Sequence, residues 1–422
     1  MTRPTATLGG PVAARLQATL YYNRKHRRER NAVVPGPTGD PIGDEVFGSQ
    51  FLIQREGPAN SLGNVGAVAP IPGTNNFIAV WRDSVDSKAR AAVLTVNTST
   101  NAITQGTAIA ASTNNAGSPS VRVVVVSATK AIMIFVDSTT SFLVAQELNI
   151  SGTTVSLGTA VNVSNGGLFA WTHGFFPTVS RVAIVYGANA TGNLLGRTLD
   201  YSSMTLGTEV ELNADHIGEG TNLVTNGTAT AMLIHKNSAS HPTAPDIGFI
   251  TGLTVSATTI TAGTPVQINA NSLGSSADNV HGAWDSVNSK WLACYTRPTV
   301  GVYARPLDIA VSDRTVTLGT EFAISASATT QEIRSFFDPS TEDFVIVTRP
   351  SAGGNLQAKH LRLVSGALSF IGTSTVFTPI APATGTSVLG AEYSSDAERT
   401  VIMFNQFGGG ASLNVRAIVM DD

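Results

Sequence analysis

The chain has 422 residues, with 26 Lys and Arg against 29 Asp and Glu, and its charged share of 13% compares with about 25% in an ordinary soluble domain. Its one cysteine excludes an internal disulfide framework, and 42% apolar residues with a net charge of -3 argue against a disordered chain. No run of about 18 apolar residues is present, which excludes a membrane-spanning helix, and abundant Thr, Ser, Val, Ala and Gly favour strands over helices.

Residues 1–38 carry a concentrated positive charge. Seven basic residues stand there against Glu29 alone, so this segment carries +6 and the remaining chain -9. Five of the basic side chains lie close together: Arg24, Lys25, Arg27, Arg28 and Arg30. We predict that residues 1–38 form an extended arm and linker that docks on an acidic partner. A solvated arm without a partner and an arm that binds nucleic acid are the alternatives.

The arm does not have the order of a secretion signal, because its basic cluster follows the mildly apolar stretch instead of preceding it. We therefore expect no secretion signal and no membrane span.

A phrase centred on Gly-Thr recurs six times in the rest of the chain. Its glycines are 49 to 56 residues apart, at Gly106, Gly158, Gly207, Gly263, Gly319 and Gly372. Seven short apolar runs alternate with these phrases and have the composition of buried strands. They are Phe77–Trp81, Ala131–Phe135, Val182–Tyr186, Ala231–Ile234, Trp291–Tyr295, Phe344–Val347 and Val401–Phe404. One strand precedes each apolar run, one follows it, and the Gly-Thr phrase forms a fourth. Every repeat therefore has four strands, which predicts a propeller blade.

The last repeat has no fourth strand of its own. The segment Ile42–Phe47 has the missing pattern and resembles Leu206–Glu211, so we predict that residues 39–50 supply the outer strand of the last blade. The sequence thus predicts an all-β fold, a seven-bladed β-propeller of four-stranded blades over residues 39–422, closed by an N-terminal strand. A β-solenoid is the alternative, but it requires shorter repeats and does not explain the split unit.

Motifs for catalysis and for metal binding are absent from the sequence. The spacings of zinc proteases, Cys-x-x-Cys sites, nucleophile elbows and phosphate-binding loops do not occur. We therefore predict that the protein is not an enzyme and has no catalytic residue, cofactor or metal. The alternative is that Glu392 or Asp285 belongs to a pair of glycosidase carboxylates. The simpler interpretation is that both are ordinary acidic residues of the surface.

Four polar side chains fall at equivalent positions of the innermost strands when the blades are aligned: Arg122, His173, His281 and Arg334. Because innermost strands line a propeller's channel, we predict a candidate ring that attracts an anion or an acidic group. A polar lining for a water-filled channel is the alternative.

Two of the four tryptophans are candidates for a sugar-binding platform. Trp171 and Trp284 lie near inner strands or their turns, whereas Trp81 and Trp291 lie on core strands and are expected to pack there.

The phrase Asn149–Val163, NISGTTVSLGTAVNV, resembles the repeats of bacteriophage virion proteins that are built on β-propellers, such as tail-fibre, appendage and nozzle-type proteins. The resemblance is one of repeat style over residues 39–422. It implies a homo-oligomeric, tail- or fibre-associated structural component of the virion, made in the host cytoplasm and held by its N-terminal extension. Other virion proteins would contact residues 1–38, and the propeller would serve assembly or attachment, with a host glycan as a candidate ligand. The alternative function is a carbohydrate-binding or carbohydrate-cleaving propeller.

Overall fold

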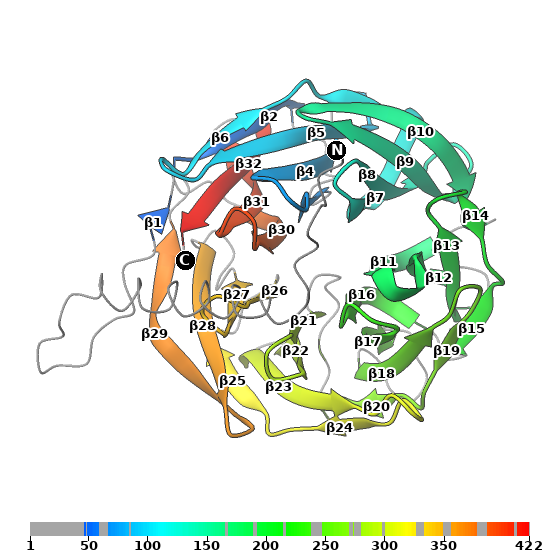
Figure 1. The fold of residues 1–422 in the computed structure, drawn as a ribbon, viewed down its shortest axis with the longest axis vertical. Coiled ribbons are helices and arrows are strands. Elements are labelled where there is room, and N and C mark those ends of the chain that lie inside the picture. The colour runs from blue at the N-terminus through cyan, green and yellow to red at the C-terminus, as the bar shows by residue number, and fades with distance from the viewer. Residues whose placement is uncertain are drawn as a thin grey trace, which may run out of the picture. The chain divides into compact units, whose positions relative to one another are not determined.

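The computed structural model shows four-stranded antiparallel blades that follow one another around a central axis (Figure 1). It describes residues 46–47, 49–58, 66–83, 86–164, 168–188, 192–213, 217–237, 247–269, 273, 280–297, 300–325, 333–348, 356–377, 386–408 and 412–421. Within these ranges the only helical element is the 3-10 turn η1 (Pro177–Val179), so the fold is all-β. The predicted arm with Arg24, Lys25, Arg27, Arg28 and Arg30 lies outside the described residues.

Seven blades make up the ring. Blade 1 contains β3 (Gly66–Pro70), β4 (Asn76–Arg82), β5 (Lys88–Asn97) and β6 (Ala102–Gln105). Blade 2 contains β7 (Ile109–Ser127), β8 (Lys130–Asp137), β9 (Leu143–Ser151) and β10 (Thr154–Asn162). Blade 3 contains β11 (Leu168–Phe176), β12 (Arg181–Ala188), β13 (Leu194–Asp200), β14 (Thr205–Leu206) and β15 (Val210–Asn213). The start of β7 also pairs with β5, so this strand links the first two blades.

The remaining blades repeat this arrangement. Blade 4 contains β16 (Ile217–Thr225), β17 (Thr230–Asn237), β18 (Gly248–Val255), β19 (Ile260–Ala262) and β20 (Val266–Gln267). Blade 5 contains β21 (Val280–Asp285), β22 (Lys290–Arg297), β23 (Gly301–Ile309), β24 (Val316–Leu318) and β25 (Phe322–Ser325). Blade 6 contains β26 (Ile333–Asp338), β27 (Asp343–Thr348), β28 (Leu356–Val364) and β29 (Ala367–Phe377). Blade 7 contains β30 (Thr386–Ser394), β31 (Arg399–Gly408) and β32 (Ser412–Asp421).

The outer strand of blade 7 comes from the N-terminal part of the chain, as the sequence predicts. Strand β1 (Val46–Phe47) and strand β2 (Phe51–Pro58) both pair antiparallel with β32, with Val46 opposite Asp421 and Phe51 opposite Ala417. The pairing continues through Pro58, so the closing segment extends past the predicted boundary at residue 50. The residues of this segment before Val46 lie outside the described part of the chain.

The hydrophobic core consists of seven clusters, and each cluster fills the interface between two adjacent blades. Successive residues of a second strand belong to different clusters, because side chains alternate between the two faces of a sheet. In β8, Ile132 and Ile134 pack towards blade 3, whereas Met133 and Phe135 pack towards blade 1. The second strands are therefore apolar on both faces, which explains their uninterrupted apolar runs.

Three of the six recurring glycines lie where one blade approaches the next. Gly106, Gly207 and Gly263 interrupt their outer strands, and each donates its backbone N–H to a carbonyl oxygen of the neighbouring strand at 2.8–2.9 Å. A Cβ at these positions would lie 2.0, 2.4 and 2.7 Å from the carbonyl oxygens of Thr153, Thr258 and Arg314, respectively. Those three oxygens belong to the turn after the third strand of the following blade. In these three copies the Gly-Thr phrase marks a backbone contact between blades, whereas Gly158 and Gly319 lie against Glu147 and Pro306 of their own blades.

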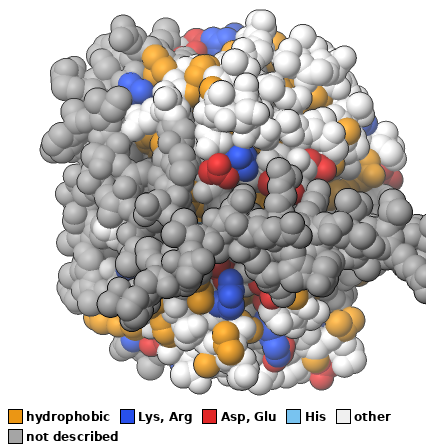
Figure 2. Space-filling view, turned by 60° about the vertical axis from the view of Figure 1, so that its left-hand side comes forward, with side chains coloured by type: hydrophobic (Ala, Val, Ile, Leu, Met, Phe, Trp, Pro, Cys, Tyr) orange, Lys and Arg blue, Asp and Glu red, His pale blue; other side chains and the backbone are white. Residues whose placement is uncertain are grey.

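The charged side chains of the ring form local pairs. Arg362 lies 2.7 Å from the buried carboxylate of Asp343, and Arg399 lies 2.8 Å from Asp421 in the last strand. Figure 2 shows basic and acidic side chains near one another on a largely uncharged surface. This mixed surface contrasts with the single-sign charge of the sequence before residue 39.

We expect Gly106→Ala to lower the free energy of unfolding by about 1–3 kcal/mol, because the added methyl group meets a backbone oxygen that cannot rotate away. Gly187→Ala is the matched control, since a Cβ at Gly187 in β12 meets nothing within 4 Å. Urea denaturation of both variants measures the difference. Equal stability of the two variants would show that the blade contact does not require glycine.

Candidate functional site in the central channel

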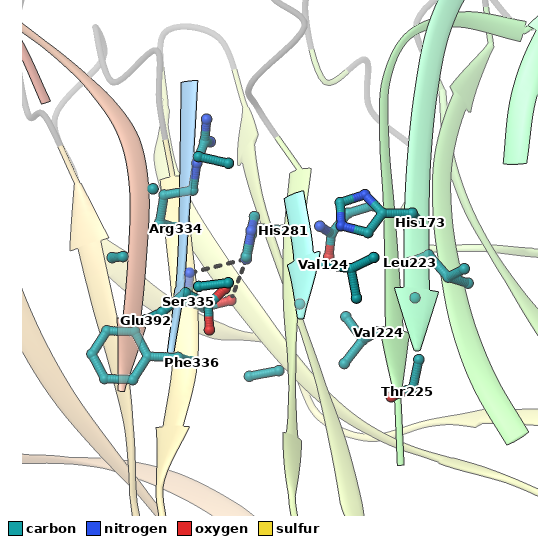
Figure 3. A pocket seen from close by; sticks show the side chains of 18 of the residues that line it. Val124, His173, Leu223, Val224, Thr225, His281, Arg334, Ser335, Phe336 and Glu392 are labelled. Carbon is teal, nitrogen blue, oxygen red and sulfur yellow. Dashed lines mark hydrogen bonds between the residues drawn. The ribbon is translucent and has the colours of Figure 1, made fainter. Parts of the chain in front are cut away.

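A channel of about 650 Å³ runs along the axis of the ring and is the candidate functional site. All seven innermost strands contribute to its lining: β3, β7, β11, β16, β21, β26 and β30. Figure 3 shows His173, His281 and Arg334 at one level, with Val124, Val224 and Phe336 further along the channel. The lining therefore combines a polar level with an apolar one.

The four predicted ring residues all line this channel. Arg122, His281 and Arg334 share one register position, opposite Ile134, Cys294 and Val347 of the second strands. The predicted equivalence is wrong for His173, which lies opposite Ile184 and one residue out of this register. Thr172, opposite Val185, holds the equivalent position in blade 3. Asn222 lies opposite Ile234 and completes the position in blade 4. Whether this ring attracts an anion stays a prediction.

Three of the four ring residues use polar atoms to hold neighbouring blades together. His173 Nε2 lies 3.0 Å from the carbonyl oxygen of Val123 on β7. His281 Nδ1 lies 3.0 Å from the backbone N–H of Ser335 on β26, from which it accepts a hydrogen bond. Arg334 Nε donates to the carbonyl oxygen of Leu389 on β30 at 3.4 Å. The ring thus fastens the inner ends of three blade interfaces.

The histidines of the ring are neutral at pH 7. Burial lowers the pKa of His173 to about 4, and the nearby Arg122 guanidinium adds to this effect. Burial, together with Arg334 and Arg122, holds the pKa of His281 well below its usual range. Positive charge at this level therefore resides on the two arginines.

Glu392 on β30 contributes a carboxyl group to the channel lining. Burial raises the pKa of Glu392 from 4.5 to about 7, so a large share of the side chain is protonated near neutral pH. Asp285, the other carboxylate considered for a glycosidase pair, accepts hydrogen bonds from the backbone N–H groups of Val287 and Asn288 at 2.9 and 2.8 Å. Asp285 thus stabilises the turn after β21.

His281 and Ser335 form a contact that resembles a base and a nucleophile, with 3.1 Å between Nδ1 and Oγ. The same Nδ1 lone pair also accepts the Ser335 backbone N–H, and Ser335 is only 3% exposed. A nucleophile needs both an available base and access to substrate. The contact therefore holds β21 and β26 together.

The two candidate platform tryptophans lie on different blades. Trp284 lines the channel and packs against Trp291, with 4.5 Å between ring centroids. It follows His281 by three residues, whereas Trp171 in β11 precedes His173 by two residues, and the side chain of Trp171 lies outside the described part. The platform stays a prediction.

The described residues contain no group of three or more His, Cys, Asp or Glu side chains arranged to hold a metal ion. Cys294 is a buried free cysteine, and burial raises the pKa of its thiol to about 12. In the described part of the chain, no helix has the length and apolar character needed to cross a membrane.

Asn222 and its neighbour Thr221 were not recognised as a site from sequence. Between the pairs Ile217–Asn237 and Thr221–His235, β16 advances four residues while β17 advances two, so this irregularity shifts the register by two residues. The alignment of blade 4 is therefore ambiguous until the partner strand is known.

No family model and no curated protein matches the chain. Among solved structures, the polysaccharide lyase Uly1 is similar over 91% of this chain and 100% of its own, with a TM-score of 0.54 and 8% identity. A candidate 6-phosphogluconolactonase from Bacteroides uniformis covers 76% of this chain and 88% of its own, with a TM-score of 0.54 and 11% identity. A protein from Lactobacillus plantarum is similar over 78% of this chain and 87% of its own, with a TM-score of 0.52 and 15% identity. At these identities the similarities show the propeller fold alone.

We expect Glu392→Gln to raise the free energy of unfolding at pH 8 by about 1–2 kcal/mol and to leave it nearly unchanged at pH 5. The native carboxyl group binds its proton more tightly than the unfolded one, so the wild type loses stability as the pH rises from about 4.5 to about 7. Gln stays neutral and removes this loss.

Glu398→Gln is the matched control, because Glu398 is an exposed carboxylate of the same blade. Urea denaturation at the two pH values measures both variants. An identical pH dependence in the wild type and Glu392→Gln would contradict the raised pKa of Glu392.

Proposed function

We propose that the protein is a structural component of a bacteriophage virion, tail- or fibre-associated, that docks through residues 1–38 and presents its propeller for assembly or host contact. The division of charge carries this proposal: the N-terminal segment holds +6 and the rest of the chain -9. A segment of net positive charge attached to a body of opposite net charge has the electrostatics of an anchor for an acidic neighbour.

The way the ring closes supports the same proposal. Strands β1 and β2 belong to the outer edge of blade 7, so the chain enters the fold at the rim. Strand β1 is held there by its backbone pairing with β32. The repeat style of Asn149–Val163 resembles virion propellers and supports a virion as the assembly.

We expect a chain without residues 1–38 to fold with an unchanged melting temperature, because it retains β1 and β2, and to be lost from assembled particles. A full-length variant in which Arg24, Lys25, Arg27, Arg28 and Arg30 are replaced by Ser is the companion, since it changes charge without changing length. Immunoblots of purified particles measure incorporation. Normal incorporation of the truncated chain would refute docking through the arm.

Nucleic-acid binding by the arm gives a different result in solution. It requires an affinity of the full chain for DNA or RNA that falls steeply as salt increases and is lost in the serine variant. An affinity that does not change with salt would exclude this role.

Carbohydrate binding is a second candidate function, favoured by the position of Trp284 in the channel lining. Aromatic rings pack against the apolar faces of sugars while hydroxyl groups bind polar atoms nearby. A glycan array and a polysaccharide-degradation assay on the full chain test binding and cleavage separately. Cleavage of a polysaccharide by the protein would contradict the proposal that it is a structural component without catalytic activity.

A further inference from the structure

Two arginines from well-separated blades, Arg122 on β7 and Arg334 on β26, line the central channel. They share one register position, opposite Ile134 and Val347 of their second strands. We call this position the arginine level. A guanidinium group stays charged at every pH at which the protein is folded, and Arg334 keeps this charge although its residue is only 5% exposed. One channel therefore contains two permanent positive charges.

The charges of both arginines act beyond the blades that carry them. Arg334 donates hydrogen bonds to the carbonyl oxygens of Ile333 at 2.8 Å and of Leu389 on β30 at 3.4 Å. Burial and then Arg122 lower the pKa of His173, whereas burial, Arg334 and Arg122, in that order, lower the pKa of His281. Arg122 thus acts on imidazoles of blades 3 and 5, and this places its charge in the channel that these blades share.

The other ionisable groups of the described lining leave it with a net positive charge. His173 and His281 are neutral at pH 7, and Glu392 is the only carboxyl group among the described residues that line the channel. Burial raises the pKa of Glu392 to about 7, so a large share of this group is also neutral near that pH. Two guanidinium groups thus face at most one carboxylate in this part of the chain.

A net positive channel selects for a ligand with a negative charge. Guanidinium N–H groups form short, charge-assisted hydrogen bonds with the oxygens of carboxylates and phosphates, and the planar fork can hold two oxygens at once. Water is limited in the channel, because Arg334 and its neighbour Ser335 are both at least 95% buried. An ion pair formed there is less screened than one on the surface.

The channel also has room for a carbon framework. Val124, Val224 and Phe336 lie further along the lining than His281 and Arg334, as Figure 3 shows, and we call them the apolar level. The volume of about 650 Å³ lies within the range of roughly 300–1,000 Å³ that small-molecule sites occupy. A ligand with a charged group at one end and an apolar body at the other matches both levels.

We propose that the central channel binds a small organic anion, a carboxylate or a phosphate monoester, whose oxyanion group lies at Arg122 and Arg334. Its carbon framework packs on the apolar level. The inference gives the predicted anion of the ring a chemical class. It depends neither on docking by the arm nor on carbohydrate binding, so it can fail while either of these holds.

Isothermal titration calorimetry of the full chain with benzoate, phenyl phosphate and benzamide tests the site, because benzamide has the shape of benzoate without its charge. We expect at least one of the two anions to bind at millimolar concentration and benzamide to bind about tenfold more weakly or not at all. Inorganic phosphate should displace the bound anion, since it needs the arginine level alone. Tighter binding of phenyl phosphate than of benzoate supports a phosphate as the ligand, and the reverse order supports a carboxylate.

Arg122→Gln removes one of the two charges and should weaken the anion about tenfold or more. Arg416→Gln is the matched control, because it makes the same change on β32, the third strand of blade 7, which does not line the channel. We expect the control to change the affinity less than about twofold. The comparison of benzoate with benzamide needs only the wild type, so it decides the question even if Arg122→Gln does not fold.

Three results would overturn the proposal. The first is the absence of binding by both anions at millimolar concentration. The second is binding of benzamide as tight as that of benzoate, which would show that the apolar level alone holds the ring. The third is an equal effect of Arg122→Gln and Arg416→Gln on the affinity, which would place the anion on the surface and leave a polar, water-filled channel.

Discussion

Burial of both faces of every second strand is the constraint on which the rest of this structure depends. A blade buries its second strand only between two neighbours, as β8 does with Ile134 on one side and Met133 on the other. No blade can therefore stand at an end of the row without exposing an apolar face, and the seven interfaces close into a ring. Closure by β1 and β2 follows from the same requirement, since Ile53 of β2 belongs to the core between blades 7 and 1.

The recurring glycines belong to the same arrangement. Apolar side chains hold blades together near the middle of each sheet, but at Gly106, Gly207 and Gly263 the backbone of the following blade itself approaches the outer strand. A side chain there would separate the blades at the rim. Glycine at these three positions and the buried runs thus both serve the contact between neighbouring blades.

The channel is where closure produces a site. Innermost strands have no further strand on their inner side, so their polar groups bind across blade interfaces or face the channel. His281 and Arg334 bind the neighbouring blades, whereas His173 satisfies one nitrogen on β7 and leaves the other without a partner. His173 lies one residue out of the register of His281 and Arg334, so it points to the preceding blade, whereas those two side chains bind the following blade.

The sequence by itself determined the all-β class, the number of blades and the N-terminal closing strand, because these depend on short-range periodicity and on a repeat length that the chain displays directly. It also predicted the equivalence of Arg122, His281 and Arg334 but misplaced His173 by one residue. The end of the closing strand at Pro58 and the place of Asn222 depended on pairing with distant strands. The protonation of Glu392 and the unpaired atom of His173 depended on burial by several blades at once. Only the tertiary structure decided these properties, because residues far apart in the chain provide the hydrogen-bond partners and exclude water from the buried groups.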